Sequence, residues 1–159
     1  MEGHRAGHNY NTHSSCNITD DDIMRRIDLI VVHCSATRAD RSFPVTALIR
    51  CHAERFGFTG YHYYITRNGR IYQTRHEQLV GAHAVGYNSH SLGVCYEGGL
   101  NPQGESADTR TPKQKRALLR LLKKLKAAHP AAQILGHRDL PGVHKDCPCF
   151  EAIKEYRDL

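Results

Sequence analysis

Residues 133–149 contain several side chains that are typical ligands of zinc. His137 follows a short apolar run that reads as the buried end of a strand, and a Pro-Gly turn then leads to Lys145, Cys147 and Cys149. Imidazole nitrogen and thiolate sulfur are ligands that Zn²⁺ prefers. A lysine beside such a site can stabilise negative charge on a group that the metal activates. This stretch therefore predicts most of a catalytic zinc site.

His33 is the candidate for the missing ligand. It ends the run 27–33, whose β-branched centre predicts a central strand covered on both faces. Functional side chains collect where strands end, although a single histidine there is more often a hydrogen-bonded structural residue. Two imidazoles and one thiolate would leave a fourth position open on the metal, as catalytic zinc sites require.

The residues alone leave the ligand set open at two places. Cys149 could replace Cys147 as the ligand, or it could pair with another thiol. His144 is closer in sequence to His137 than Cys147 is, and it would serve as a ligand if the loop folds differently.

The first half of the chain predicts a strand, a helix and a hairpin. The strand 27–33 is followed by a helix over about 45–55, with Leu48 and Ile49 facing inward and Gly57 ending it. Asn68-Gly69 between two β-rich runs predicts a hairpin over 62–74.

The second half predicts a strand over 91–97, a helix over 112–128, a strand that leads to His137 and a short helix over 150–156. Leucines at helical spacing form one apolar stripe on the helix 112–128, and lysines and arginines fill the rest. Alternating strands and helices predict the α/β class, with a mixed central β-sheet flanked by helices.

Composition favours one soluble domain with an anionic partner. The chain has 159 residues, 40% of them apolar and 24% charged, with a net charge of +6 and a pI near 9.1. No apolar stretch is long enough to span a membrane, and the first residues lack the apolar core of a secretion signal. We expect a flexible polar arm over 1–25 and a single catalytic domain over 26–159.

The six cysteines are expected to be mostly reduced, because the chain is long for a disulfide scaffold and shows no secretion signal. Among them, Cys34, Cys51 and Cys95 are expected to pack in the core.

Several separated motifs, in order, resemble those of the zinc-dependent N-acetylmuramoyl-L-alanine amidases, and most closely their phage-lysozyme branch. The motifs are Val32-His33-Cys34-Ser35-Ala36-Thr37, Gly60-Tyr61-His62-Tyr63, 81–88, Ser91-Leu92-Gly93-Val94-Cys95, Gly136-His137 and Lys145-Asp146-Cys147-Pro148. The resemblance covers about 27–156 and implies the fold shared with peptidoglycan-recognition proteins.

The resemblance implies one Zn²⁺ per chain, held by His33, His137 and Cys147, because the Cys-Pro pattern of the family selects Cys147. It places Tyr61 and Lys145 beside the metal, as groups that stabilise the tetrahedral intermediate. Related recycling amidases carry a glutamate where Glu97 stands, so Glu97 is a second-tier general base or a charge at a strand end. Two further residues, His83 and Asn88, are expected to line the substrate groove.

The implied reaction is hydrolysis of the amide between N-acetylmuramic acid and L-alanine in peptidoglycan. One rival is a peptidoglycan-binding recognition module without activity, although such proteins commonly lack the cysteine that Cys147 would supply. Another is a basic regulator that binds nucleic acid or a polymerase, which the absence of aromatic residues interleaved on the helix 112–128 disfavours. We expect a monomer that stays in the cytoplasm and reaches the cell wall on lysis, as a phage or prophage lysin would. A cytoplasmic amidase that recycles muropeptides is the alternative.

Overall fold

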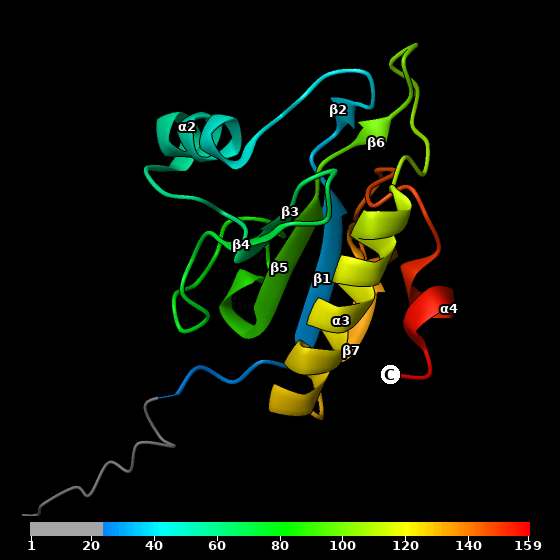
Figure 1. Cartoon of the computed structure of the whole chain (residues 1–159). Helices are drawn as coiled ribbons and strands as arrows, with labels where there is room; N and C mark the ends of the chain where they lie inside the picture. The colour runs from blue at the N-terminus through cyan, green and yellow to red at the C-terminus, as the bar shows by residue number, and fades with distance from the viewer. Residues whose placement is uncertain (1–23) are drawn as a thin grey trace, which may run out of the picture.

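A five-stranded mixed sheet forms the centre of the molecule, as the sequence predicted (Figure 1). The computed structural model describes residues 24–159. In spatial order the strands are β4 (Ile71–Gln73), β3 (Tyr63–Ile65), β5 (Ser91–Tyr96), β1 (Leu29–Cys34) and β7 (Gln133–Gly136). Only β4 is antiparallel to its neighbour, so the carboxyl ends of the other four strands point the same way.

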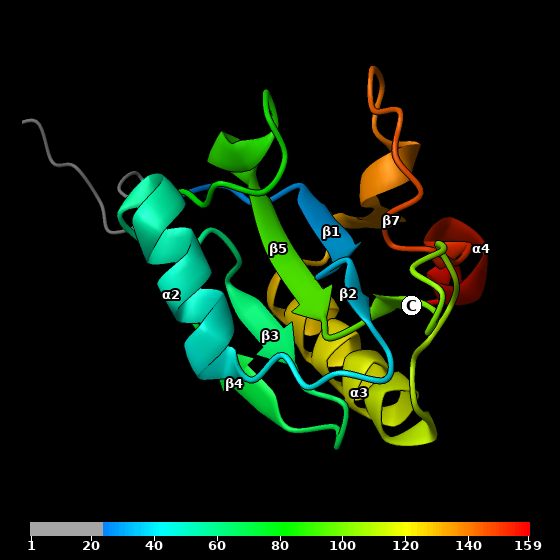
Figure 2. The ribbon, with the colours of Figure 1, turned by 90° about the horizontal axis from the view of Figure 1, so that it is seen from above.

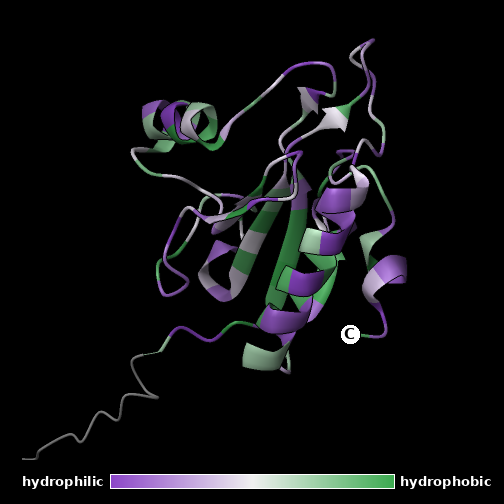
Figure 3. Ribbon diagram, viewed as in Figure 1, coloured by the Kyte–Doolittle hydropathy of each residue, from purple (hydrophilic) through white to green (hydrophobic). Residues whose placement is uncertain are grey.

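Helix α3 (Pro112–Ala128) covers one face of the sheet. Its leucine stripe, which includes Leu118 and Leu122, is buried against Ile30 and Val32 of β1. Figure 3 shows hydrophilic segments along the same helix, where lysines and arginines are exposed to solvent. Thr111 is the N-cap of this helix, since its side chain accepts a hydrogen bond from the Gln114 backbone.

Helix α2 (Val45–Phe56) lies on the opposite face of the sheet (Figure 2). Its inner stripe contacts the sheet through Leu48, which packs with Tyr64 and Cys95. The predicted end at Gly57 is confirmed, since this residue has φ +78. Ile49 was predicted to face inward and Cys51 to pack in the core. Both predictions are wrong, because the two residues are exposed. The helix touches the sheet along one narrow stripe, and both residues project away from it.

The predicted hairpin is also confirmed, with β3 and β4 joined by a turn in which Gly69 has φ +81. The structure adds a small parallel sheet that the sequence did not indicate, made of β2 (Thr37–Arg38) and β6 (Gly99–Leu100). Strands of two residues are too short to show the alternation from which strands are predicted.

The last helix, α4 (Ala152–Tyr156), is held to the start of α3 by a buried arginine. The Arg110 guanidinium pairs with Asp108 and Glu155 and donates to the Tyr156 hydroxyl. It also stacks 3.3 Å from the centroid of the Phe150 ring. The segment that carries His137 and Cys147 is thereby fixed to the domain at its C-terminal end.

Most of the predicted arm, residues 1–23, lies outside the described residues, and its flexibility stays a prediction. Arg25, the last residue assigned to it, is bound to the domain through hydrogen bonds from its guanidinium to the carbonyls of Glu77, Asn88 and Ser91. Within the described part of the chain, none of the helices is both long and apolar enough to cross a bilayer.

Candidate metal centre

The structure brings His33, His137 and Cys147 together at the carboxyl ends of β1 and β7. Their ligand atoms all lie within 4.8 Å of one another, and His33 Nδ1 is 3.8 Å from Cys147 Sγ. Tetrahedral zinc with usual bond lengths separates a nitrogen and a sulfur ligand by roughly 3.6 Å. The donor types and their spacing therefore fit Zn²⁺.

Alternation along β1 decides where His33 points. Its neighbours Val32 and Cys34 belong to the core under α3, so His33 faces the other side of the sheet, where α2 lies. His137 begins a short 3-10 helix, η2 (His137–Asp139), directly after β7. Strands β1 and β7 are parallel neighbours, and their register brings both histidines to the same end of the sheet.

Hydrogen bonds fold the loop after η2 back so that Cys147 reaches the histidines. The Arg138 N–H donates to the Cys147 carbonyl at 2.8 Å, and the Tyr96 hydroxyl donates to the Pro148 carbonyl at 2.6 Å. The Cys34 N–H donates to the Cys147 sulfur at 3.3 Å. The sulfur is thus held by β1, the strand that carries His33.

The environment favours the protonation states that zinc requires. Burial, with smaller contributions from neighbouring histidines and Lys145, holds the pKa of His33 well below 6.5, and burial also lowers the pKa of His137. Hydrogen bonds from Cys34 lower the pKa of Cys147, and the Lys145 charge adds to that effect. Neutral imidazoles and a thiolate are the forms that bind Zn²⁺.

His83 lies behind the metal candidates instead of in open solvent. His33 Nε2 and His83 Nδ1 are hydrogen-bonded at 2.9 Å, and His33 Nδ1 faces Cys147; when Nδ1 binds a metal, the proton of His33 is on Nε2 and His33 is the donor. In that tautomer His83 Nδ1 accepts, and its Nε2 donates to the Ser91 hydroxyl at 3.2 Å. Gly93 makes room for this chain of bonds, since a Cβ there would lie 2.7 Å from the His83 ring. Both His83 nitrogens are therefore engaged within the protein.

The Tyr61 ring packs at a tilt against the rings of His33 and His52. Its ring centroid lies 5.0 Å from that of His33 and 5.0 Å from that of His52. His52 is itself held, because its Nδ1 accepts a hydrogen bond from the Gly60 N–H at 2.9 Å. Burial raises the pKa of Tyr61 well above 10, so its hydroxyl stays a donor at neutral pH.

Lys145 is exposed, and its charge acts on the centre from the loop. Its positive charge contributes to the lowered pKa values of His33, His137 and Cys147.

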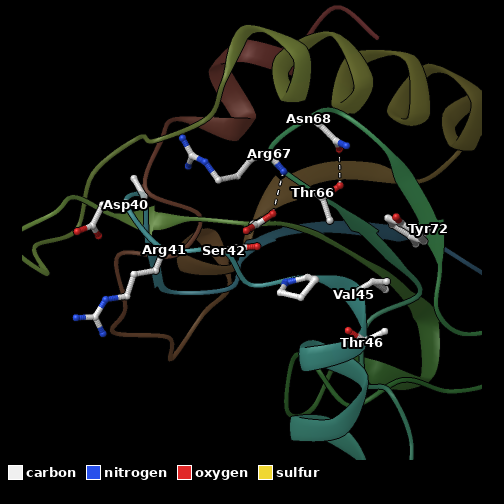
Figure 4. A pocket seen from close by; sticks show the side chains of 12 residues that line it. Asp40, Arg41, Ser42, Val45, Thr46, Thr66, Arg67, Asn68 and Tyr72 are labelled. Atoms are coloured by element: carbon white, nitrogen blue, oxygen red, sulfur yellow. Dashed lines mark hydrogen bonds between the residues drawn. The ribbon is translucent and has the colours of Figure 1, made fainter.

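Glu97 has another set of partners. Its carboxylate is buried and accepts hydrogen bonds from the N–H groups of Phe43 and Arg67, at 2.7 and 2.9 Å. Figure 4 shows the second of these bonds at the wall of a cavity of about 600 Å³. That cavity lies between the chain leading into α2 and the hairpin turn, and His33, His137 and Cys147 are not among its lining residues.

Asn88 organises the loop that carries His83. Its Oδ1 accepts hydrogen bonds from the N–H groups of His83 and Ala84, both at 2.9 Å.

Two residues that support the metal candidates, Ser91 and His52, were not predicted as site residues from the sequence. Ser91 begins one of the segments that resemble the amidase family, which is the signal that could have identified it. His52 lies inside a predicted helix, and no local pattern indicates its role.

The two alternative ligands lie apart from the cluster. The Cys149 sulfur is directed at the Gly99 carbonyl and at the Cys34 sulfur, 3.4 and 3.8 Å away. His144 is exposed on the loop. Among the described residues, the cluster of potential metal ligands contains Cys147 and neither of these two.

The chain resembles known proteins in family, sequence and fold. Residues 23–150 match the N-acetylmuramoyl-L-alanine amidase family. The endolysin of Enterobacteria phage K11 is 39% identical over 121 residues, which cover 76% of this chain and 79% of the relative. The N-acetylmuramoyl-L-alanine amidase LysC from Clostridium intestinale superposes with a TM-score of 0.67 at 29% identity, covering 84% and 83% of the two chains. Bumblebee PGRP-SA, at 20% identity, TM-score 0.65 and coverage of 83% and 81%, supports the fold alone. The chain therefore belongs to the N-acetylmuramoyl-L-alanine amidase family and is an enzyme of that class.

Proposed function

We propose that the protein is a zinc-dependent amidase that hydrolyses the bond between the lactyl group of N-acetylmuramic acid and L-alanine in peptidoglycan. The observation that carries this proposal is the convergence of His33, His137 and Cys147 in a chain of the amidase family. Zinc bound there would act as a Lewis acid toward the scissile carbonyl and lower the pKa of water.

The ligands are prepared for this role by the protein. The backbone of β1 holds the Cys147 sulfur, and the bond to His83 fixes the ring of His33. Such secondary partners orient ligands and raise metal affinity. His83 acts in this proposal through His33, in addition to the groove position that the family resemblance implies for it and for Asn88.

Tyr61 and Lys145 would stabilise the negative charge that develops on the carbonyl oxygen. Tyr61 supplies a protonated hydroxyl on a ring that packs against His33, and Lys145 supplies a positive charge that contributes to the lowered pKa values of the three ligand candidates. Donors aimed at developing charge account for a large part of catalysis in acyl transfer. Glu97 remains the second-tier candidate, with both carboxylate oxygens engaged by backbone N–H groups.

The biological setting that we propose is lysis of the cell wall by a phage-type or prophage-type endolysin. Support comes from the K11 endolysin, which aligns over most of its own length. The net charge of +6 suits binding to an anionic wall polymer. We propose that the chain works as a monomer with one zinc ion and reaches the wall when the cell membrane fails.

The test is a digestion of purified peptidoglycan with zinc-loaded protein, chelator-treated protein and treated protein given zinc again. New amino groups and reducing sugar ends are measured in parallel. We expect amino groups that disappear with the chelator and return with zinc, and no reducing ends. Reducing ends would contradict amide cleavage, and muropeptide binding without either product would indicate a recognition module.

The ligand assignment is tested by metal analysis of two variants. Cys147→Ala should lose bound zinc and activity together, because a required donor is absent. His144→Gln is the matched control on the same loop and should keep both. Zinc retention in Cys147→Ala would contradict the proposed ligand set.

A further inference from the structure

Two thiols meet beside the metal centre without belonging to it. The sulfur atoms of Cys34 and Cys149 lie 3.8 Å apart, although the residues are separated by 115 positions in the chain. Cys34 directly follows His33 on β1, and Cys149 is two residues beyond Cys147. The pair therefore links the two segments that supply these ligand candidates.

The surroundings leave the two sulfurs room to join. A disulfide has an S–S distance of about 2.05 Å, so the sulfurs would have to approach by less than about 2 Å. Gly99 faces both, and a Cβ at this position would lie 2.5 Å from the Cys34 sulfur and 3.7 Å from the Cys149 sulfur. The absence of a side chain at Gly99 thus keeps the space around the pair open.

The loop also holds Cys149 in an uncommon backbone conformation. Its φ of +69 lies in the left-handed region, which few residues other than glycine, asparagine and aspartate adopt. The Cys149 N–H donates to the Asp146 carbonyl at 2.6 Å, which stabilises this conformation. This backbone conformation is therefore held at Cys149, the residue whose sulfur contacts Cys34.

Other thiols in the described part of the chain are poorly placed to compete. Cys95 packs with Leu48 on the face of the sheet opposite the cluster that contains Cys34. Cys51 is exposed on α2. Cys147 would be occupied by zinc in the loaded enzyme, which leaves Cys34 and Cys149 as the free neighbours.

We propose that Cys34 and Cys149 are an oxidation site, which forms a disulfide when the zinc-loaded protein meets a small-molecule disulfide such as oxidised glutathione. Cys149 is partly exposed and Cys34 is 5% exposed, so Cys149 attacks the oxidant first. One glutathione leaves as a thiol, and a mixed disulfide forms on Cys149. Cys34 then attacks the Cys149 sulfur and releases the second glutathione. Two protein thiols lose two electrons and two protons, and one oxidised glutathione becomes two reduced molecules.

The consequence is a clamp between β1 and the loop that carries Cys147. A cross-link between distant positions restricts how far β1 and the loop can separate. Zinc would leave more slowly as a result, because its release requires His33 on β1 and Cys147 on the loop to move apart. Formation of the disulfide stands independently of the proposed function, whereas its effect on zinc rests on that function. An oxidising medium outside the cell is where such a bond would form and persist.

The first experiment maps the disulfide directly. Full-length Cys16→Ser/Cys51→Ser protein is loaded with zinc, treated with oxidised glutathione, digested without reduction and analysed by mass spectrometry. The expected product is a cross-linked peptide pair containing Cys34 and Cys149, lighter by two hydrogens than the separate peptides. A cross-link through Cys147 or Cys95, or glutathione left on Cys149 without a cross-link, would overturn the proposal.

Two further variants supply the controls. Cys149→Ser in the same background should form no cross-link, and this residue is partly exposed, so the fold is expected to tolerate the change. Cys34→Ser should keep glutathione on Cys149, because the resolving thiol is absent. Prompt loss of that glutathione in Cys34→Ser would contradict the assigned order of attack.

The second experiment measures zinc release to a coloured chelator. The oxidised protein should release zinc roughly tenfold more slowly than the reduced protein, as expected when a long loop is tied down. Cys149→Ser treated with the same oxidant should release zinc at the reduced rate. An unchanged rate in the cross-linked protein would overturn the clamp. A cross-linked protein that never held zinc would count against the proposed zinc enzyme and not against the disulfide.

Discussion

At the scale of single residues, the metal centre is defined by what lies behind each ligand. His33 is oriented by His83 and Ser91, and the Cys147 sulfur is bound by the Cys34 N–H. Tyr61 is held between His33 and His52. These contacts separate groups that would bind the metal from groups that would act on the substrate, and the two sets can be tested apart.

Tyr61→Phe should lower kcat by about 100-fold or more while bound zinc stays stoichiometric, because the variant loses a donor to the developing oxyanion and no metal ligand. Steady-state kinetics and metal analysis check this together. Tyr72→Phe is the matched control, since Tyr72 lines the separate cavity beside Glu97. Loss of zinc from Tyr61→Phe would mean that the hydroxyl supports the metal site instead.

Ser91→Ala should weaken zinc affinity by roughly 10-fold, because removal of a secondary partner loosens the ring that orients the ligand. Competition with a chelator of known affinity measures the change. Ser89→Ala, on the exposed neighbouring position, should leave the affinity unchanged. Equal affinities for wild type and Ser91→Ala would show that the bond from His83 to Ser91 does not support His33.

At the scale of elements, the end of β5 ties two connections to the sheet. The Glu97 carboxylate accepts N–H groups from the chain that enters α2 and from the hairpin turn. The Gln114 side chain of α3 donates to the carbonyls of Ile65 and Glu97 from the other face. Helix, hairpin and sheet thus meet at one buried polar junction away from the three ligand candidates.

Glu97→Gln should lower the free energy of unfolding by about 2 kcal/mol, because an amide NH₂ replaces an acceptor for a buried N–H. Activity of the folded protein should stay within a few-fold of wild type. Denaturant unfolding and kinetics on the same preparations separate the two effects. A loss of kcat of about 100-fold or more with unchanged stability would instead identify Glu97 as a general base.

At the scale of the whole molecule, one face of the sheet forms the core and the other carries the candidate site. Helices α3 and α2 lie on opposite faces of the sheet (Figure 2). The face under α3 is the main apolar core, and the other face carries His33 and Tyr61. Buried histidines make the second face sensitive to acid. His62 is fully buried, accepts the Gly93 N–H and donates to the Leu79 carbonyl.

Zinc-free protein should therefore lose stability as the pH falls from about 6.5 to about 4. Burial lowers the pKa of His62 to about 4, whereas the unfolded chain binds that proton near pH 6.5. Above pH 6.5 His62 is neutral in both the folded and the unfolded state, so its full contribution to the free energy of unfolding is present. Between the two values only the unfolded state is protonated, so about 3 kcal/mol is lost across this window.

Denaturant unfolding at several pH values, with the His62 ring followed by NMR, checks this prediction. The ring should remain neutral at pH 5 in the folded protein. A His62 ring that is already protonated at pH 5, or a stability that does not change over the window, would contradict it.

The sequence by itself determined the α/β class, the helix at 112–128, the hairpin at 62–74 and the types of residue able to bind zinc. These follow from local periodicity, capping and turn chemistry, which depend on residues close together in the chain. It did not separate Cys147 from Cys149 without help from the family resemblance, and it missed β2, β6 and the exposure of Cys51.

Only the tertiary structure decided which side chains meet. The register of β1 against β5 and β7 brings His33 to His137, and the path of the loop after η2 directs Cys147 to the histidines and Cys149 to Cys34. The same packing engages both nitrogens of His83 and both oxygens of Glu97 inside the protein. The physical reason is that such contacts join residues far apart in the chain, so they depend on strand register and loop path, which no local pattern encodes.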